Sequence, residues 1–273
     1  MIKKLLILLL LCSPAFGQMK PMMGQQIDWS HPLAKGLVRY WPMLEGTGNI
    51  TQDLSGNGNV GTVVGTAPSW IAGNYGSAIN LPGTDEYISV GTSDMGVVNE
   101  LTIIVYVTIT GAQATNPITQ RGDLYSHVWF LYAGNTNLYS WFKTTGKDSN
   151  ISGGNCLTYG KLHQICLRAS TITGNVDLIV DGVIKGTTAG YTGTIISSGE
   201  LKFGNRGGTV FGYSRLHMVS IYNRALTAGE IAELRSNPFG IIQPTFSVWW
   251  YSGIGGEPPA TSIPIFMYHY LNH

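Results

Sequence analysis

Short runs of apolar and β-branched residues recur through the middle of this 273-residue chain, and turn-forming residues separate them. Segments such as 55–59 and 81–85 are rich in turn formers, among them Gly, Asn, Asp, Ser and Pro. Most of these residues tolerate positive φ or hydrogen-bond their own backbone. Short strands at this spacing predict an all-β sandwich or barrel. The expected strands cover 37–41, 87–90, 101–109, 128–132, 138–142, 162–167, 176–180 and 216–222.

One hairpin is predicted with particular clarity. Asp181-Gly182 separates the apolar runs 176–180 and 183–186. Asp-Gly between two apolar strands favours a type I′ turn, because both central positions require positive φ.

One helix is predicted near the end of the strand-rich region. Thr227 and Glu230 have the spacing of a capping box, in which each side chain binds the backbone N–H of the other residue. Ile231 and Leu234 follow at helical spacing, and Pro238 ends the segment.

The N-terminus has the plan of a signal peptide. Two lysines precede the apolar run 5–11, and Ala15 and Gly17 are small residues at the positions that a signal peptidase reads. The run is much shorter than the roughly 20 residues that a spanning helix needs. We therefore expect 1–17 to be removed and the mature chain to be secreted, extracellular or at the cell surface, with no transmembrane segment. Lipidation of Cys12 is the competing interpretation.

The chain carries little charge, and the charge is scattered. Asp, Glu, Lys and Arg make up 11% of it, less than half of the usual share of about 25%. Removal of 1–17 lowers Lys plus Arg from 16 to 14, against 15 Asp plus Glu. Recognition of a phosphate backbone requires clustered basic residues, so we expect no nucleic-acid partner.

An ordered set of motifs covers roughly residues 36 to 236. The motifs are 36–43 with 45–48, 53–62, 78–88, 101–103, 162–165 ahead of 178–182, and 223–234. In this order they resemble the laminin-G-like (LamG) domains of the concanavalin A-like lectin/glucanase superfamily. The resemblance implies a two-sheet antiparallel jelly-roll sandwich with one short C-terminal helix. It also implies recognition of glycans or protein ligands outside the cell, sometimes through calcium. Leu162 departs from the family, which has an aromatic residue there.

The predicted organisation is one domain with a lead-in and a tail. The tail is rich in aromatic residues, Pro and Gly, and it either packs on the sandwich or docks onto a partner. The divisions are 1–17 for the signal peptide, 18–35 for the lead-in, 36–238 for the LamG-like domain and 239–273 for the tail.

Three classes of function remain open at this point. The leading hypothesis is an exported, non-catalytic binding or adhesion module whose partner is a glycan or a surface protein. One alternative is a structural component of a cell-surface or virion assembly. The other is a glycoside hydrolase or polysaccharide lyase of the same superfamily. Hydrolysis uses two carboxylates about 5 to 9.5 Å apart, and no two acids stand at i, i+2 within an expected strand. We therefore expect no enzyme.

Aromatic residues are concentrated in the stretch 121–143, on two neighbouring expected strands. Amphipathic rings pack on hydroxylated ligands while nearby polar groups hydrogen-bond to them. Side chains alternate between the two faces of a strand, so some of these rings must face the core. The candidate ligand-binding residues are Tyr125, Trp129, Tyr139 and Trp141.

A loop rich in oxygen-bearing side chains is the candidate metal site. Asp53 and Asn57 lie in a run with such side chains at alternate positions, which is a spacing suited to calcium. The remaining ligands would be Glu45 and Asp85. The alternative is that these residues form a series of tight turns without any ion.

Two cysteines remain after the predicted cleavage, Cys156 and Cys166. They flank a turn-like segment, so they either pair across a hairpin in an oxidising compartment or remain free thiols.

Overall fold

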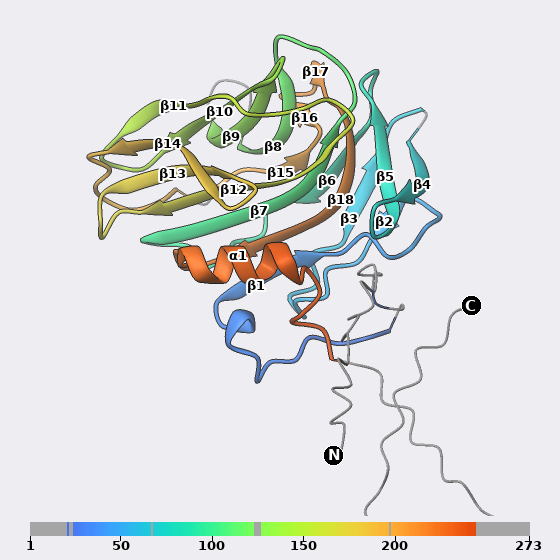
Figure 1. Ribbon diagram of the computed structural model, residues 1–273, viewed down its shortest axis with the longest axis horizontal. Coiled ribbons are helices and arrows are strands. Elements are labelled where there is room, and N and C mark those ends of the chain that lie inside the picture. Colours follow the sequence, from blue (N-terminus) through green and yellow to red (C-terminus); the bar gives the residue numbers. More distant parts are fainter. Residues whose placement is uncertain (1–20, 22–23, 67, 123–126, 197, 244–273) are drawn as a thin grey trace, which may run out of the picture.

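Two antiparallel β-sheets, packed face to face, form the body of the protein in a computed structural model (Figure 1). The structure describes residues 21, 24–66, 68–122, 127–196 and 198–243. The predicted signal peptide at 1–17 and the part of the tail from residue 244 onward lie outside the described residues. The predicted jelly-roll sandwich with one short C-terminal helix is confirmed.

The first sheet contains eight strands. They are β1 (Leu37–Trp41), β4 (Ser69–Gly73), β5 (Gly76–Pro82), β7 (Glu100–Ile109), β12 (Leu162–Ser170), β13 (Asn175–Val180), β14 (Val183–Ala189) and β18 (Tyr213–Tyr222). Their order is β14-β13-β12-β7-β18-β5-β4, and β1 also pairs with β18. The long strands β7, β12 and β18 form its centre.

The second sheet also contains eight strands. They are β2 (Ile50–Thr51), β3 (Gly61–Val64), β6 (Tyr87–Gly91), β8 (Asn116–Gly122), β9 (His127–Gly134), β10 (Asn137–Lys143), β11 (Asp148–Asn155) and β15 (Leu201–Phe203). Their order is β11-β10-β9-β8-β15-β6-β3-β2. A small hairpin of β16 (Asn205–Arg206) and β17 (Val210–Phe211) lies beside β8. Each strand expected from the sequence is present, with bounds that differ by no more than about three residues.

The apolar core lies between the sheets, and β7 shows how the alternation of side chains builds it. Ile103, Val105 and Val107 belong to the core between the sheets. Ile104 and Tyr106 belong to a second apolar cluster on the outer face of the same sheet. Successive side chains of a strand point to opposite faces. The centre of the first sheet is therefore buried on both sides, which explains the long apolar runs of its central strands.

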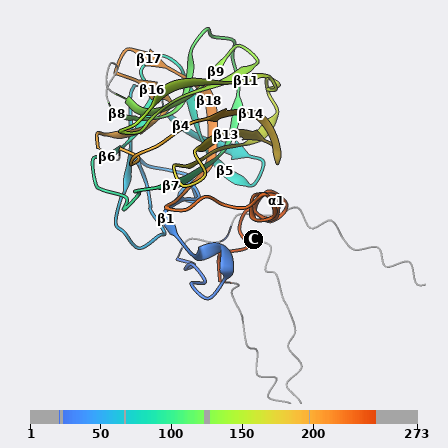
Figure 2. The same cartoon turned by 90° about the vertical axis from the view of Figure 1, so that its left-hand side faces the viewer.

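The helix α1 (Ala228–Ser236) covers the outer face of the first sheet together with a 3₁₀ turn, η1 (Pro32–Ala34). Ile231 and Leu234 of α1 join the apolar cluster there. Figure 2 shows α1 end-on against this sheet, with β9 and β11 on the far side of the sandwich. No helix within the described ranges is long and apolar enough to cross a membrane.

The lead-in and the start of the tail pack on the same face. Ile27 and Ile242 form an antiparallel bridge, and both are buried. Phe239 packs against the same apolar cluster. The described part of the predicted tail is therefore attached to the domain.

Both local predictions are confirmed. Asp181 and Gly182 have φ of 52° and 80°, and they connect β13 to β14 through the pair Val180↔Val183. Positive φ at both positions is the type I′ signature. Thr227 and Glu230 form a complete capping box at the start of α1.

The two cysteines are free thiols and lie on different sides of the first sheet. Cys156 packs against the core between the sheets, whereas Cys166 is fully buried in the cluster under α1. Of the two alternatives, free thiols are therefore confirmed, and the disulfide across a hairpin was wrong.

Candidate ligand-binding sites

The outer face of the second sheet presents aromatic side chains from β10. Leu138 and Phe142 point into the core between the sheets, and the alternate residues Tyr139 and Trp141 are half-buried on the outer face. Because the period of a strand is two, one inward side chain fixes the outward position of the next.

Four outward rings form a continuous set, which we call the ring row: Phe130 and Tyr132 of β9 with Tyr139 and Trp141 of β10. Tyr132 is directly opposite Tyr139, and Phe130 is directly opposite Trp141. The Phe130 and Tyr132 rings stack with centroids 4.6 Å apart, and those of Tyr132 and Tyr139 with centroids 5.2 Å apart. The guanidinium carbon of Arg206 lies 4.8 Å from the Phe130 centroid. Cross-strand packing and a cation–π contact therefore hold the row in one arrangement.

Three members of the ring row reach the surface. Phe130 is only 2% exposed, whereas Tyr132, Tyr139 and Trp141 are half-buried. The next strand supplies polar groups: Asn150 is opposite Trp141, and Ser152 is opposite Tyr139; both are exposed. Rings beside amide and hydroxyl groups suit a ligand that has both apolar and hydroxylated faces.

The prediction for Trp129 was wrong. Its side chain is fully buried in the core between the sheets, because β9 turns residue 129 inward and residue 130 outward. Tyr125 lies outside the described residues. Phe130 and Tyr132 belong to the ring row instead. They can be identified only once it is known which face of β9 points into the core.

The carboxylate of Asp53 organises the Asn- and Gly-rich loop. Oδ1 accepts hydrogen bonds from the backbone N–H groups of Tyr40 (3.0 Å) and Ser55 (2.9 Å). Oδ2 accepts from the backbone and side-chain nitrogens of Asn59, each at 3.3 Å. Four protein donors thus occupy this carboxylate.

The other predicted metal ligands are also engaged in local contacts. Glu45 Oε1 accepts from a backbone N–H at 2.7 Å, and Asp85 accepts from the backbone and hydroxyl of Thr66. Asn57 Nδ2 donates to a backbone carbonyl at 2.9 Å. No group of three or more Asp, Glu, His or Cys side chains suited to a metal occurs among the described residues. Glu45, Asp53 and Asp85 therefore do not form the predicted ligand set, and calcium binding stays a prediction.

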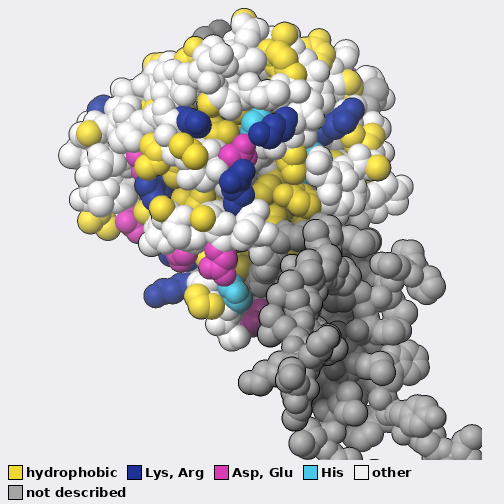
Figure 3. Space-filling model, viewed as in Figure 1, with side chains coloured by type: hydrophobic (Ala, Val, Ile, Leu, Met, Phe, Trp, Pro, Cys, Tyr) yellow, Lys and Arg dark blue, Asp and Glu magenta, His cyan; other side chains and the backbone are white. Residues whose placement is uncertain are grey.

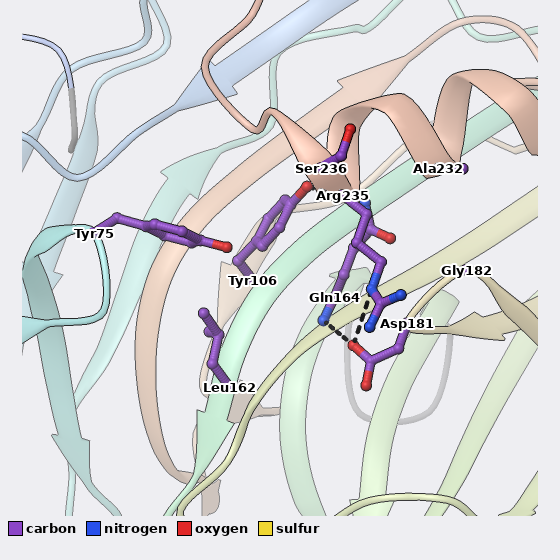
Figure 4. A pocket seen from close by; sticks show the side chains of 9 residues that line it. All are labelled: Tyr75, Tyr106, Leu162, Gln164, Asp181, Gly182, Ala232, Arg235 and Ser236. Carbon is purple, nitrogen blue, oxygen red and sulfur yellow. Dashed lines mark hydrogen bonds and ion pairs between the residues drawn. The ribbon is translucent and has the colours of Figure 1, made fainter. Parts of the chain in front are cut away.

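A cavity of about 500 Å³ lies between α1 and the outer face of the first sheet, and we call it the α1 cavity (Figure 4). Tyr75 lines one end, and Asp181 and Arg235 line the other; Tyr106 and Gln164 lie between them. Tyr106 and Gln164 are cross-strand partners on β7 and β12. The volume is within the range of about 300 to 1,000 Å³ that is usual for ligand sites. No sequence motif pointed to this cavity.

We call the end of the α1 cavity that Asp181 and Arg235 line the charged end. Several polar and charged groups surround the Asp181 carboxylate there. His163 Nε2 accepts from a backbone N–H at 3.0 Å, so the neutral ring carries its proton on Nδ1 and donates it to Asp181 at 2.9 Å. Gln164 N also donates to Asp181 at 3.1 Å. Lys161 Nζ and Arg235 Nε approach the same carboxylate only to 4.0 and 3.9 Å. Two permanent cations thus lie beside one anion.

Solved structures with the same fold come from several kinds of protein. The binding domain of Paraclostridial Mosquitocidal Protein 1 matches with 19% identity and a TM-score of 0.60, over 76% of this chain and 53% of that domain. Domain 4 of AbnA, a GH43 extracellular arabinanase from Geobacillus stearothermophilus, was solved in complex with arabinotriose. It matches with 16% identity and a TM-score of 0.58, over 73% of this chain and 98% of that domain.

A third example is the Trypanosoma rangeli sialidase in complex with the inhibitor DANA. It matches with 15% identity and a TM-score of 0.57, over 75% of this chain but 33% of the enzyme. The chain thus spans about half of the toxin binding domain and a third of the sialidase. At these identities the matches establish the fold.

The sequence itself identifies the family. A comparison with curated proteins finds no match. The model of a laminin G family, described as the concanavalin A-like lectin/glucanases superfamily, matches residues 82–232. The matched segment is more than half of the chain, and it contains the ring row and most of the lining of the α1 cavity. This chain belongs to the concanavalin A-like lectin/glucanases superfamily.

Proposed function

We propose that this chain is an exported, non-catalytic module that binds glycans through the ring row. The observation that carries the proposal is the register of Tyr132, Tyr139 and Trp141 on the sheet face opposite to α1. Sugar rings present apolar C–H faces between their hydroxyl groups. Fixed aromatic rings beside an exposed amide and hydroxyl complement both kinds of surface.

The comparisons support a binding role. Domain 4 of AbnA, of which this chain spans nearly the whole length, was solved with arabinotriose. Other matches are the binding domains of a mosquitocidal protein and of botulinum neurotoxin serotype G. The predicted signal peptide at 1–17 supports a role outside the cell.

The charged groups that border the ring row support binding rather than hydrolysis. Lys143 Nζ lies 3.7 Å from Asp148 Oδ2 at the end of the β10–β11 pair, and both side chains are about 40% exposed. Glycoside hydrolysis needs two carboxylates placed across the ligand. The carboxylate at this edge of the ring row is instead paired with a lysine.

A glycan array followed by titration of the hits tests the proposal. We expect Trp141→Ala and Tyr139→Ala to weaken binding by about tenfold or more, because each removes a stacking ring worth about 1 to 3 kcal/mol on an aromatic platform. Trp29→Ala is the matched control, since Trp29 is 56% exposed in the lead-in and outside the row. Its affinity is expected to equal that of the parent protein.

Two results would overturn the proposal. One is unchanged affinity in both ring-row variants while the folded state is intact. The other is release of reducing ends from a bound polysaccharide, which would make the chain a hydrolase.

A further inference from the structure

The α1 cavity contains a buried hydrogen-bond acceptor without a partner. Gln164 is 3% exposed and lines the cavity. Its Nε2 donates to Tyr106 Oη at 2.9 Å and to the Ile231 carbonyl at 3.2 Å, which fixes the orientation of the amide. Its Oε1 has no hydrogen-bond partner among the described residues. A buried acceptor left in this state costs folding free energy, so a bound donor is favoured there.

The two cations at the charged end are held loosely. Arg235 approaches Asp181 through Nε alone, and its side chain is 51% exposed. Lys161 is 61% exposed and reaches Asp181 only at 4.0 Å. Within the described part of the chain, the terminal amino groups of Arg235 make no hydrogen bond. Their fork geometry matches a carboxylate. Figure 3 shows hydrophobic side chains gathered in the middle of this face, with basic and acidic groups beside them.

The opposite end of the cavity is aromatic. Tyr75 makes edge-to-face contacts with Tyr106 and Phe239, with centroids 6.0 and 5.6 Å apart. The Tyr75 hydroxyl points toward the middle of the cavity (Figure 4). Tyr106 Oη already donates to the Leu234 carbonyl at 2.5 Å, so the Tyr106 hydroxyl has no proton left to donate to a ligand. Tyr106 therefore only lines the cavity. Tyr75 thus offers a ring and a hydroxyl to a ligand.

We propose that the α1 cavity is a second binding site, and that its ligand is a sugar acid, a hydroxylated ring that bears one carboxylate. The carboxylate binds the terminal amino groups of Arg235, with Lys161 beside it. A ring hydroxyl donates to Gln164 Oε1, and the ring lies against Tyr75. This site is on the sheet opposite to the ring row and does not depend on it.

The test compares D-glucuronate with D-glucose, because the two differ only at C6, which is a carboxylate in the first and a hydroxymethyl group in the second. We expect glucuronate to bind at millimolar concentration and glucose about tenfold more weakly or not at all. In an NMR titration of the purified protein, the shifted signals should be the amides of 232–236 and the Gln164 side-chain amide. Arg235→Gln should remove the preference for glucuronate.

Matched variants make the result decisive. Arg215→Gln removes an exposed arginine that does not line the cavity, and it should bind glucuronate like the parent protein. Trp141→Ala should also leave glucuronate binding unchanged, which separates this site from the ring row. Gln164→Met should weaken binding of the acid, and Arg235→Gln remains informative where that core variant does not fold. Equal binding of both sugars, no binding of glucuronate at about 10 mM, or full binding by Arg235→Gln would overturn the proposal.

Discussion

Arg224 Nη2 lies 2.7 Å from Glu230 Oε1, and the Glu230 carboxylate also closes the capping box of α1. Glu230 Oε2 accepts from the backbone N–H of Thr227 at 2.8 Å, and Thr227 Oγ1 accepts from the backbone N–H of Glu230. One carboxylate thus joins the segment that follows β18 to the start of the helix that covers the first sheet.

The ion pair between Arg224 and Glu230 should make the free energy of unfolding depend on pH. The hydrogen bond from Arg224 lowers the pKa of Glu230 to about 2, from an ordinary value of 4.5. A carboxyl whose folded pKa is lowered stabilises the protein fully above the unfolded pKa, and this contribution is lost as pH falls toward the folded pKa. We expect Glu230→Gln to cost about 1 kcal/mol near neutral pH. Its melting temperature should also fall less steeply than that of the parent protein below about pH 5.

Thermal melts from neutral pH to about pH 2.5 check this expectation. Glu233→Gln is the control, because Glu233 lies on the same helix with a 55% exposed side chain and takes no part in the cap. Parallel melting curves for the parent protein and Glu230→Gln would contradict the assignment.

The two tryptophans of the predicted aromatic site should behave in opposite ways. Trp129 is fully buried between the sheets, so Trp129→Ala should cost about 3 to 5 kcal/mol of unfolding free energy. Trp141 is half-buried on the outer face, so Trp141→Ala should cost much less. Denaturant unfolding measures both. Equal losses would mean that Trp141 also has a structural role in the core.

The sequence predicted the strands well because the signals are local. Asp181 and Gly182 fix a turn, Thr227 and Glu230 fix a helix start, and both act within a few residues. The face of a strand is not local. Trp129 and Phe130 are adjacent aromatic residues, and only the packing of β9 against the first sheet decides which of them faces the core between the sheets.

The α1 cavity was beyond sequence reasoning for the same reason. Its lining comes from Tyr75, Tyr106, Gln164, Asp181 and Arg235, which are scattered over 160 residues of sequence. Gln164 is unremarkable in a strand pattern. Its unsatisfied oxygen becomes visible only when α1 lies above it.

The two thiols should differ in reactivity. Burial raises the pKa of both, and Cys166 is fully buried whereas Cys156 is partly accessible. Since the thiolate is the reactive form, we expect both to react slowly with a thiol reagent in the native state, and Cys156 to react first. Mass spectrometry of peptides alkylated before and after unfolding assigns the sites. Isolation of a Cys156–Cys166 disulfide from the native protein would contradict the structure.

Asp53→Ala separates the two interpretations of the Asn- and Gly-rich loop. The carboxylate accepts four hydrogen bonds from Tyr40, Ser55 and Asn59. Bonds to a charged acceptor contribute about 1.5 to 3 kcal/mol each, so the variant should lose at least about 2 kcal/mol even in a chelator. Asp28→Ala is the control, because its carboxylate binds only neighbouring residues in the exposed lead-in. Stability equal to that of the parent protein in chelator would refute the structural role of Asp53.

The same measurements decide whether calcium binds. A ligand that binds only the folded state raises the melting temperature in proportion to the logarithm of its concentration. If the loop binds calcium, millimolar calcium raises the melting temperature of the parent protein, and Asp53→Ala abolishes that rise. The hydrogen-bond contribution remains in chelator, whereas the calcium contribution appears only when the ion is added, so the two effects are measured separately. A parent protein whose melting temperature is indifferent to both calcium and chelator would make the calcium prediction wrong. Asp53 would then act only through its hydrogen bonds to the turns.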